Sequence, residues 1–350
     1  MQIREIIAQL EQFAPPALQE SYDNAGLLTG RPDWECTGML CCLDATEEVV
    51  EEAIAKGINL VVAHHPIVFG GLKKINGKNY VEQTIIRAIK NDIALYAIHT
   101  NLDNVMEGVN ARIAAVIGLQ QLRILAPKEQ TLRKLITFVP HAQADTVRNA
   151  LFAAGGGMIG QYSECSFNSE GTGTFRAAET AQPFAGERGV RHSEPETRLE
   201  MVFPATAQAS MLSALFNAHP YEEVAYDIIN LANPHPGIGA GMVGELPEPM
   251  QESAFLALLR DRFSVPVVRH TAFTGRPVKK VALCGGAGSS LISKALNAGA
   301  DCYVTADLKY HEFFDANGKM LLADIGHYES EQFTISLLQE VLAQKFPTFA

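Results

Sequence analysis

Two adjacent imidazoles, His64 and His65, lie where a run of apolar residues ends. The run, residues 58–63, is short and β-branched, which predicts a buried strand, and Pro66 ends it. The loops at the carboxyl ends of parallel strands carry the chemistry of α/β proteins, so the pair lies where a metal ion or a substrate would bind. The alternative for a histidine pair on its own is that one ring packs in the core and the other faces water.

Two further segments place metal-binding side chains after predicted strands. Residues 93–98 predict a strand that leads into the sequence HTNLD, which ends at Asp103. His327 and Glu331 are four residues apart at the start of a predicted helix, so both side chains fall on one face within reach of a single ion. Alone, this pair is better explained by a helix cap and a favourable helix dipole.

The candidate ligands are therefore His64, His65, Asp103, His327 and Glu331. All five follow the carboxyl ends of predicted strands, which share one rim if the strands belong to one parallel sheet. Five imidazole and carboxylate ligands exceed the needs of one tetrahedral ion but suit two ions that share a bridging carboxylate. The absence of thiolate from this set favours Zn, Mn, Fe or Co.

Four other polar side chains, Asp23, Asn24, Asp307 and His311, are candidates for orienting the ligands or touching a substrate. Ordinary roles in turns or in the core explain them equally well. Residues 284–290 form a glycine-rich segment that we expect to open a helix. This segment lacks the spacing of a dinucleotide fingerprint and the lysine of a P-loop, which favours a tight turn over a phosphate site.

The composition narrows the class of protein. The chain has 350 residues, 47% hydrophobic and 19% charged, which predicts a well-packed protein of two domains. The net charge of -11 argues against binding to nucleic acid or to an anionic membrane surface. We expect a cytoplasmic protein, because no apolar run approaches the roughly 20 residues of a membrane span and the start is an amphipathic helix. The six cysteines show no CxxC spacing and are expected to be buried, reduced thiols.

The order of predicted elements is α/β. Residues 1–127 alternate helix and strand, which predicts the first half of a doubly wound α/β domain. Residues 128–234 follow the order β-α-β-β-α-β, with a polar loop from 179 to 196, which predicts an inserted ferredoxin-like α+β domain. Residues 235–350 resume the α/β pattern, with strands at 265–269 and 279–284 and a final helix from 327 to 345. We expect the two flanking halves to join and complete one sheet.

These residues coincide with a known family. The chain resembles the Nif-three-like dinuclear-metal proteins, also called GTP cyclohydrolase one type two homologues, over essentially its whole length. The motifs that carry the resemblance are YDNAG at 22–26, HHP at 64–66, HTNLD at 99–103, GH at 326–327 with Glu331, and HPYEE at 219–223.

The resemblance implies a function and an assembly. It makes His64, His65, Asp103, His327 and Glu331 the ligands of two divalent ions, with Glu331 bridging. It also implies a toroidal homohexamer and an insert similar to the CutA and PII folds. The chain departs from many members at GIGAGMVGEL, residues 237–246, which contains no arginine, so a basic contact is not expected there.

Two functions remain open at this point. The first is a metal-dependent hydrolase that acts on a small nucleotide, since the family name implies opening of the GTP ring. The second is a non-catalytic regulatory or sensor protein that uses the insert to bind a ligand or partner. Metal-dependent turnover that is lost with Glu331→Gln would separate the two.

Overall fold

The computed structural model describes residues 1–347 and divides the chain into two compact units. The first unit consists of Met1–Pro127 together with the segment that begins at Gly237, and the second consists of Lys128–Pro236. The second boundary lies two residues beyond the one expected from the sequence. None of the helices in the described residues is long and apolar enough to cross a membrane.

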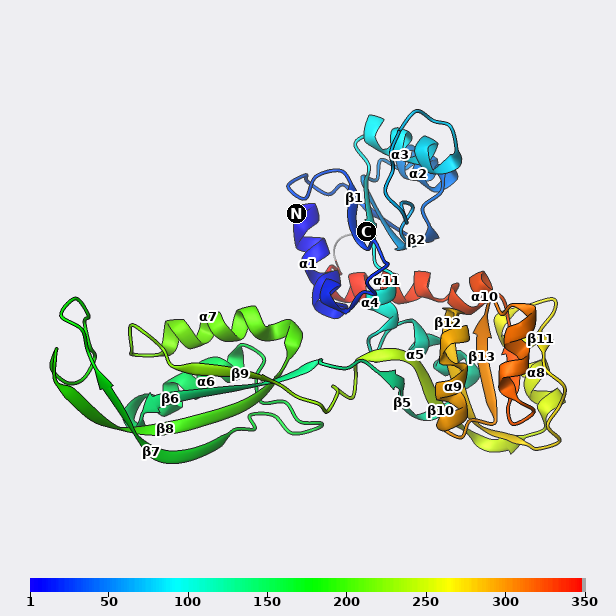
Figure 1. The fold of residues 1–350 in the computed structure, drawn as a ribbon. Coiled ribbons are helices and arrows are strands. Elements are labelled where there is room, and N and C mark those ends of the chain that lie inside the picture. Colours follow the sequence, from blue (N-terminus) through cyan, green and yellow to red (C-terminus); the bar gives the residue numbers. More distant parts are fainter. Residues whose placement is uncertain (348–350) are drawn as a thin grey trace. The chain divides into compact units, whose positions relative to one another are not determined.

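The first unit contains a four-stranded sheet with the order β1-β4-β3-β2, drawn in blue to cyan in Figure 1. Strands β2, β3 and β4 are parallel, and β1 is antiparallel to β4. Thr46 caps α2, because its hydroxyl accepts a hydrogen bond from the amide of Val49. The elements of this half are β1 (Gly26–Thr29), β2 (Met39–Asp44), α2 (Glu47–Ala55), β3 (Leu60–His65), α3 (Tyr80–Lys90) and β4 (Ala94–Ala97).

A second sheet of six strands follows the order β11-β14-β13-β12-β10-β5. Strands β12, β13 and β14 are parallel, whereas β10 and β11 pair antiparallel with their neighbours. The expectation of one shared sheet was therefore wrong, because each parallel triplet is flanked by its own antiparallel strands. The strands are β5 (Gln120–Pro127), β10 (Gly239–Met250), β11 (Arg269–His270), β12 (Val278–Ala287), β13 (Cys302–Ala306) and β14 (Leu321–Asp324).

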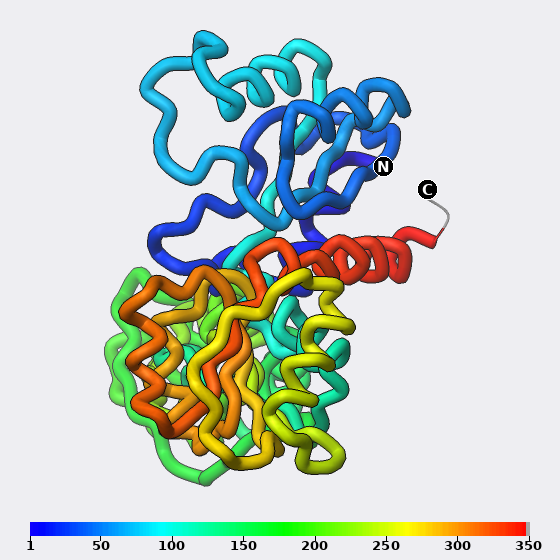
Figure 2. Tube along the Cα trace, turned by 90° about the vertical axis from the view of Figure 1, so that its right-hand side faces the viewer, coloured from blue at the N-terminus to red at the C-terminus, as the bar shows by residue number. Residues whose placement is uncertain are grey.

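One large hydrophobic core joins the two halves of the first unit. It contains side chains from both sheets and from four long helices, including Leu10, Val62, Phe255 and Leu338. Helix α11, red in Figure 2, packs against α1, α5 and β2. The helices are α1 (Ile3–Phe13), α4 (Thr100–Asp103), α5 (Val109–Ile117), α8 (Glu252–Phe263), α9 (Ile292–Asn297), α10 (His327–Glu331) and α11 (Thr334–Lys345), with 3-10 turns η1 (Pro16–Leu18), η4 (Ser289–Leu291) and η5 (Tyr310–Ala316).

The C-terminal half differs from the prediction in three places. The strand expected at 265–269 is reduced to Arg269–His270. Strand β12 continues through the glycine-rich segment to Ala287, so the segment does not open a helix directly. The single final helix is two helices, because α10 ends at Glu331 and α11 begins at Thr334.

The second unit leaves the first unit between two paired strands. Strands β5 and β10 are antiparallel, with Pro127 opposite Gly239. Residues 128–236 therefore replace the turn of a long β-hairpin. This connection explains how a unit of this size is accommodated without separating the strands that flank it.

The second unit has the order β-α-β-β-α-β and an antiparallel sheet with the order β7-β8-β6-β9. Its helices bury one face of the sheet, where alternate side chains such as Leu199, Met201 and Phe203 form the core. Strand β8 begins at Arg191, so the polar loop is shorter than expected. The elements are β6 (Leu132–Pro140), η2 (His141–Gln143), α6 (Ala144–Ala153), β7 (Phe167–Arg176), β8 (Arg191–Pro204), η3 (Ala205–Ala207), α7 (Gln208–Ala218) and β9 (Tyr226–Asn230).

Candidate metal centre

The histidine pair forms the end of β3, flanked by the parallel strands β2 and β4. Successive side chains of a strand point in opposite directions, so His64 and His65 approach the centre from different sides. His64 is completely buried, and its Nδ1 is 2.9 Å from the carbonyl oxygen of Ile98. Nδ1 of His65 is 2.8 Å from Oδ1 of Asp44, the last residue of β2.

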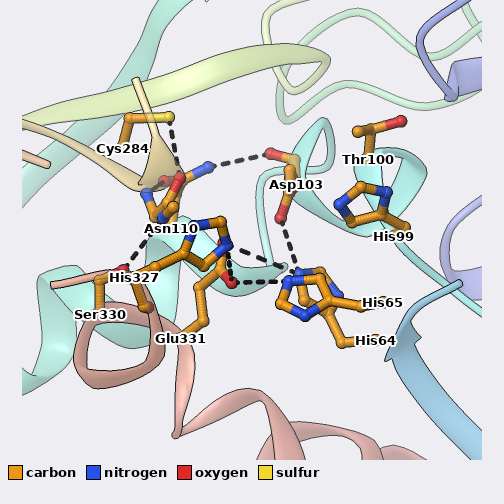
Figure 3. Close-up of polar contacts among 12 residues, drawn as sticks. His64, His65, His99, Thr100, Asp103, Asn110, Cys284, His327, Ser330 and Glu331 are labelled. Atoms are coloured by element: carbon orange, nitrogen blue, oxygen red, sulfur yellow. Dashed lines mark hydrogen bonds and ion pairs between the residues drawn. The ribbon is translucent and has the colours of Figure 1, made fainter. Parts of the chain in front are cut away.

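Helix α10 contributes His327 and Glu331 from the second half of the chain. One turn of helix places Oε2 of Glu331 3.1 Å from Nε2 of His327. The same Oε2 lies 3.0 Å from Nε2 of His65. Gly286 allows this approach, because a Cβ atom at that position would lie 2.5 Å from Oε1 of Glu331. The carboxylate is therefore shared by imidazoles from both halves of the unit (Figure 3).

Asp103 completes the predicted set at the end of α4. Its Oδ1 lies 3.7 Å from Nε2 of His64, and Oε1 of Glu331 lies 3.9 Å from the same nitrogen. Both His64 Nε2 and Asp103 Oδ1 are buried and have no hydrogen-bond partner among the described residues. Buried polar atoms are almost always satisfied, so two unsatisfied atoms that face each other fit a cation between them.

His99 is a residue that the sequence reasoning missed. Its ring lies 5.3 Å from the rings of both His64 and His65, and these three histidines have nitrogens within 4.8 Å of one another. Nδ1 of His99 is 2.8 Å from Oδ1 of Asp23. The sequence did contain an indication of its role. His99 directly follows the predicted strand of residues 93–98, just as His64 directly follows the predicted strand of residues 58–63.

All four imidazoles are oriented by an acceptor behind the ring. His65, His99 and His327 have a carboxylate at Nδ1, and His64 has a backbone carbonyl. An Nδ1–H that donates outward leaves Nε2 with its lone pair directed at the centre, which is the usual arrangement of metal-binding histidines. The acceptors are Asp44, Asp23, Asp307 and Ile98.

Burial and mutual contacts shift the pKa values of the groups in the centre. Burial acts to lower the pKa of His65, but hydrogen bonds to Asp44 and Glu331 raise it to about 10. A hydrogen bond to Glu331 raises the pKa of His327 to about 9. Burial acts to raise the pKa of Glu331, but hydrogen bonds from the surrounding imidazoles hold it well below its usual range. Burial raises the pKa of Asp103 to about 6.

Comparison with known proteins identifies the family. The sequence model of the family Duf34/NIF3 (NGG1p interacting factor 3) matches residues 1–350. The chain belongs to the Duf34/NIF3 family. A relative from Halalkalibacterium halodurans, named GTP cyclohydrolase 1 type 2 homolog, is 40% identical over 92% of this chain and 87% of its own length. A Bacillus subtilis protein of the same name is 40% identical over 93% of this chain and 88% of its own length.

A solved NIF3 structure has the same fold. The crystal structure of a Bacillus cereus protein related to NIF3 superposes with a TM-score of 0.87 and 39% identity, covering 99% of this chain and 94% of the other. The mixed α/β architecture with several sheets is therefore that of the NIF3 family.

The remaining candidate residues of this NIF3 protein fall into two groups. Asp23 and Asp307 lie directly behind ligand-type histidines. Asn24 donates from Nδ2 to the carbonyl of Val68, and His311 is exposed beside Tyr310, so neither belongs to the metal-type clusters. In the glycine-rich segment, the amides of Gly285 and Gly286 donate to Asn110 and Ser330 and are not free for a phosphate.

A cavity of about 620 Å³ opens beside the metal-type clusters of this NIF3 chain. Asp103, His327 and Glu331 form part of its wall, together with His99. The rings of Tyr22 and Phe69, which also line the cavity, lie 6.4 Å apart with an angle of 32° between their planes. The cavity is large enough for a small organic molecule.

Proposed function

We propose that this NIF3-family protein is a dinuclear metal-dependent hydrolase that acts on a small nucleotide. The observation that carries the proposal is the carboxylate of Glu331, which belongs to two clusters of metal-type ligands. One ion would be held by His64, Asp103 and Glu331, and the other by His65, His327 and Glu331. Glu331 would bridge the two ions.

Two buried polar atoms support the proposal that these residues bind divalent ions. Nε2 of His64 and Oδ1 of Asp103 lack hydrogen bonds among the described residues, and a cation would satisfy both at once. The nitrogen and oxygen donors suit Zn, Mn, Fe or Co. When bound, two such ions polarise a substrate oxygen and lower the pKa of a bound water.

The chain itself would supply substrate positioning. His99 is held by Asp23 and borders the cavity, so its ring would contact a bound substrate and orient it. Tyr22 and Phe69 are largely exposed and offer two aromatic faces at the cavity, which suits a planar base. The name of the relatives supports GTP as the first substrate to test.

We further propose that the protein is a cytoplasmic homohexamer. Large exposed apolar side chains, such as Tyr310, Phe314 and Tyr328, support burial against other copies. The six free cysteines support a reducing compartment. Sedimentation analysis would test the hexamer.

A second function, ligand binding by the inserted unit, is favoured by a separate observation. The unit has a cavity of its own, of about 690 Å³. Its β-α-β-β-α-β order and antiparallel sheet support our proposal that it is a CutA/PII-like domain. This function does not exclude hydrolysis at the metal centre.

The decisive experiment combines elemental analysis with a hydrolysis screen. We expect two divalent ions per chain and slow turnover of GTP or a related nucleotide, which stops on chelation and returns with Mn or Zn. Full metal occupancy without turnover of any nucleotide or phosphoester would leave ligand binding as the function.

A further inference from the structure

The cavity of the second unit is lined only by residues between Phe138 and Ala225, so it is built without any residue of the metal centre. Its walls come from the hairpin of β7 and β8, the connection between them, Phe138 of β6, and the segment before β9. Its volume of about 690 Å³ is in the range of small-molecule sites.

A buried carboxylate lies at this cavity without a cationic partner. Glu196 is only 7% exposed, and its Oε1 accepts a hydrogen bond of 2.8 Å from the hydroxyl of Tyr221. Within residues 1–347, no other donor bonds to the Glu196 carboxylate and no Lys, Arg or His forms an ion pair with it. A buried carboxylate is normally paired or hydrogen-bonded at both oxygens, so Oε2 has capacity for a donor from a ligand.

The neighbouring strand makes room for this carboxylate by presenting glycines to it. A Cβ atom at Gly173 would lie 2.1 Å from Oε2 of Glu196. Gly171 is opposite Glu196 in the strand pairing, and a Cβ atom there would meet no atom within 4 Å, so open space remains on that side. Any larger residue at Gly173 would therefore displace the carboxylate.

Aromatic rings form the apolar part of the wall. The ring of Tyr221 lies 6.2 Å from that of Phe175 and 6.1 Å from that of Phe184. Phe184 belongs to the connection between β7 and β8, which is tied to the opposite wall by a hydrogen bond of 2.8 Å from the amide of Gln182 to Glu222. The cavity therefore offers ring faces suited to a flat ligand.

The charge of the wall selects for cations or for N–H donors. Four glutamates and two arginines line the cavity. One of the arginines, Arg198, is engaged by Glu200 at 2.9 Å. This excess of carboxylates disfavours an anionic ligand.

We propose that the second unit binds a small planar ligand that carries an amidine or guanidine group. The flat body would lie against Tyr221 and Phe175, and adjacent N–H groups would donate to Glu196, which is the pairing that carboxylates make best. The same donor edge occurs in free aromatic amidines and in the guanine ring. This proposal does not depend on hydrolysis at the metal centre.

Calorimetric titration of the full-length, metal-loaded protein with benzamidine tests the proposal. Benzoate has the same ring with the opposite charge and is the matched control ligand. We expect benzamidine to bind and benzoate not to bind. Glu196→Gln should weaken benzamidine binding by at least about tenfold, since a charge-assisted hydrogen bond is lost. Glu187→Gln, an exposed glutamate of the same unit outside the cavity, should bind as the unaltered protein does.

Gly173→Ala provides a second variant should Glu196→Gln fail to fold, and it is expected to weaken binding because it displaces the carboxylate. Guanosine is the second probe and distinguishes a nucleobase from a free amidine. The proposal is supported if either probe binds and if both variants weaken that binding. Equal binding of benzoate, unchanged binding in both variants, or no binding of either probe at millimolar concentration would overturn it.

Discussion

Oε2 of Glu331 lies 3.0 Å from Nε2 of His65, although 266 positions separate the two residues in the chain. His65 ends a strand of the first sheet, and Glu331 belongs to the helix that follows the last strand of the second sheet. Neither half of the first unit therefore contains a complete centre. Metal binding is expected to stabilise the contact between the halves, because an ion that binds only the folded arrangement shifts the folding equilibrium toward it.

Replacing Glu331 with glutamine should lower the metal content from the proposed two ions per chain to less than one, since both clusters lose their shared carboxylate. Elemental analysis of the purified variant measures this directly. Glu340→Gln changes an exposed glutamate on α11 and should keep both ions. Retention of two ions in Glu331→Gln would contradict the bridging assignment.

Removing the acceptor behind a histidine should weaken metal binding without removing a ligand. Asp307→Asn is suitable because Asp307 has a φ of 56°, a conformation that asparagine tolerates. We expect a loss of about 10- to 100-fold in affinity for the ion at His327, measured by competition with a chelating dye. Asp315→Asn, an exposed residue of η5, is the control. Equal affinities in the two variants would show that Asp307 does not orient the ring.

Metal affinity should rise with pH. In the metal-free protein, raised pKa values of about 10 for His65 and about 9 for His327 keep both rings protonated at pH 7. An ion must displace these protons, so binding releases protons at pH 7 and becomes tighter toward pH 9. The same pKa shifts also stabilise the metal-free fold. This stabilisation is fully present below a pH of about 6.5, which is the pKa of a histidine in the unfolded chain, and it is lost as the pH rises through 9 to 10. Calorimetry in buffers of different ionisation enthalpy counts the protons, and an absence of release would refute the assignment.

The aromatic pair at the metal-side cavity should affect substrate binding more than turnover. Tyr22→Ala should raise the KM for a nucleotide by roughly fivefold or more, in line with about 1 kcal/mol or more for stacking on one base. Tyr22→Phe keeps the ring and should change KM little. A fall in kcat with an unchanged KM would show that Tyr22 acts on the reaction and not on binding.

Deleting the second unit should leave the metal centre intact. A short glycine-serine linker from Pro127 to Gly237 would close the hairpin, because Pro127 is already opposite Gly239. We expect a soluble protein with its full metal content, measured by elemental analysis. Loss of both solubility and metal would show that the second unit is required for the fold of the first.

The sequence predicted the elements whose side chains alternate or repeat regularly. Strands β3 and β4 and the β-α-β-β-α-β order of the second unit follow from hydrophobic periodicity. The five chosen ligand candidates come together because each lies at the carboxyl end of a parallel strand or in the short helix that follows one, and this did not require the single sheet that we expected. His99 was missed because nothing in the sequence shows that Asp23 lies behind it.

Strand β10 could not be predicted, because its glycines remove the side-chain pattern on which prediction rests. The reason for the glycines is visible only in the fold. A Cβ atom at Gly239 would lie 2.2 Å from the carbonyl oxygen of Ala126, and one at Gly244 would lie 2.6 Å from the side chain of Leu122. Both neighbours belong to β5, so the glycines permit the close approach of the strands that border the second unit.

The paired strands β5 and β10 also bear on how such a chain changes over generations. Because Pro127 and Gly239 face each other across the hairpin, we expect that one genetic event which adds or removes the whole intervening segment would preserve the register of the host sheet. The same position would accept a fluorescent domain, which would make the hairpin a site for building a sensor.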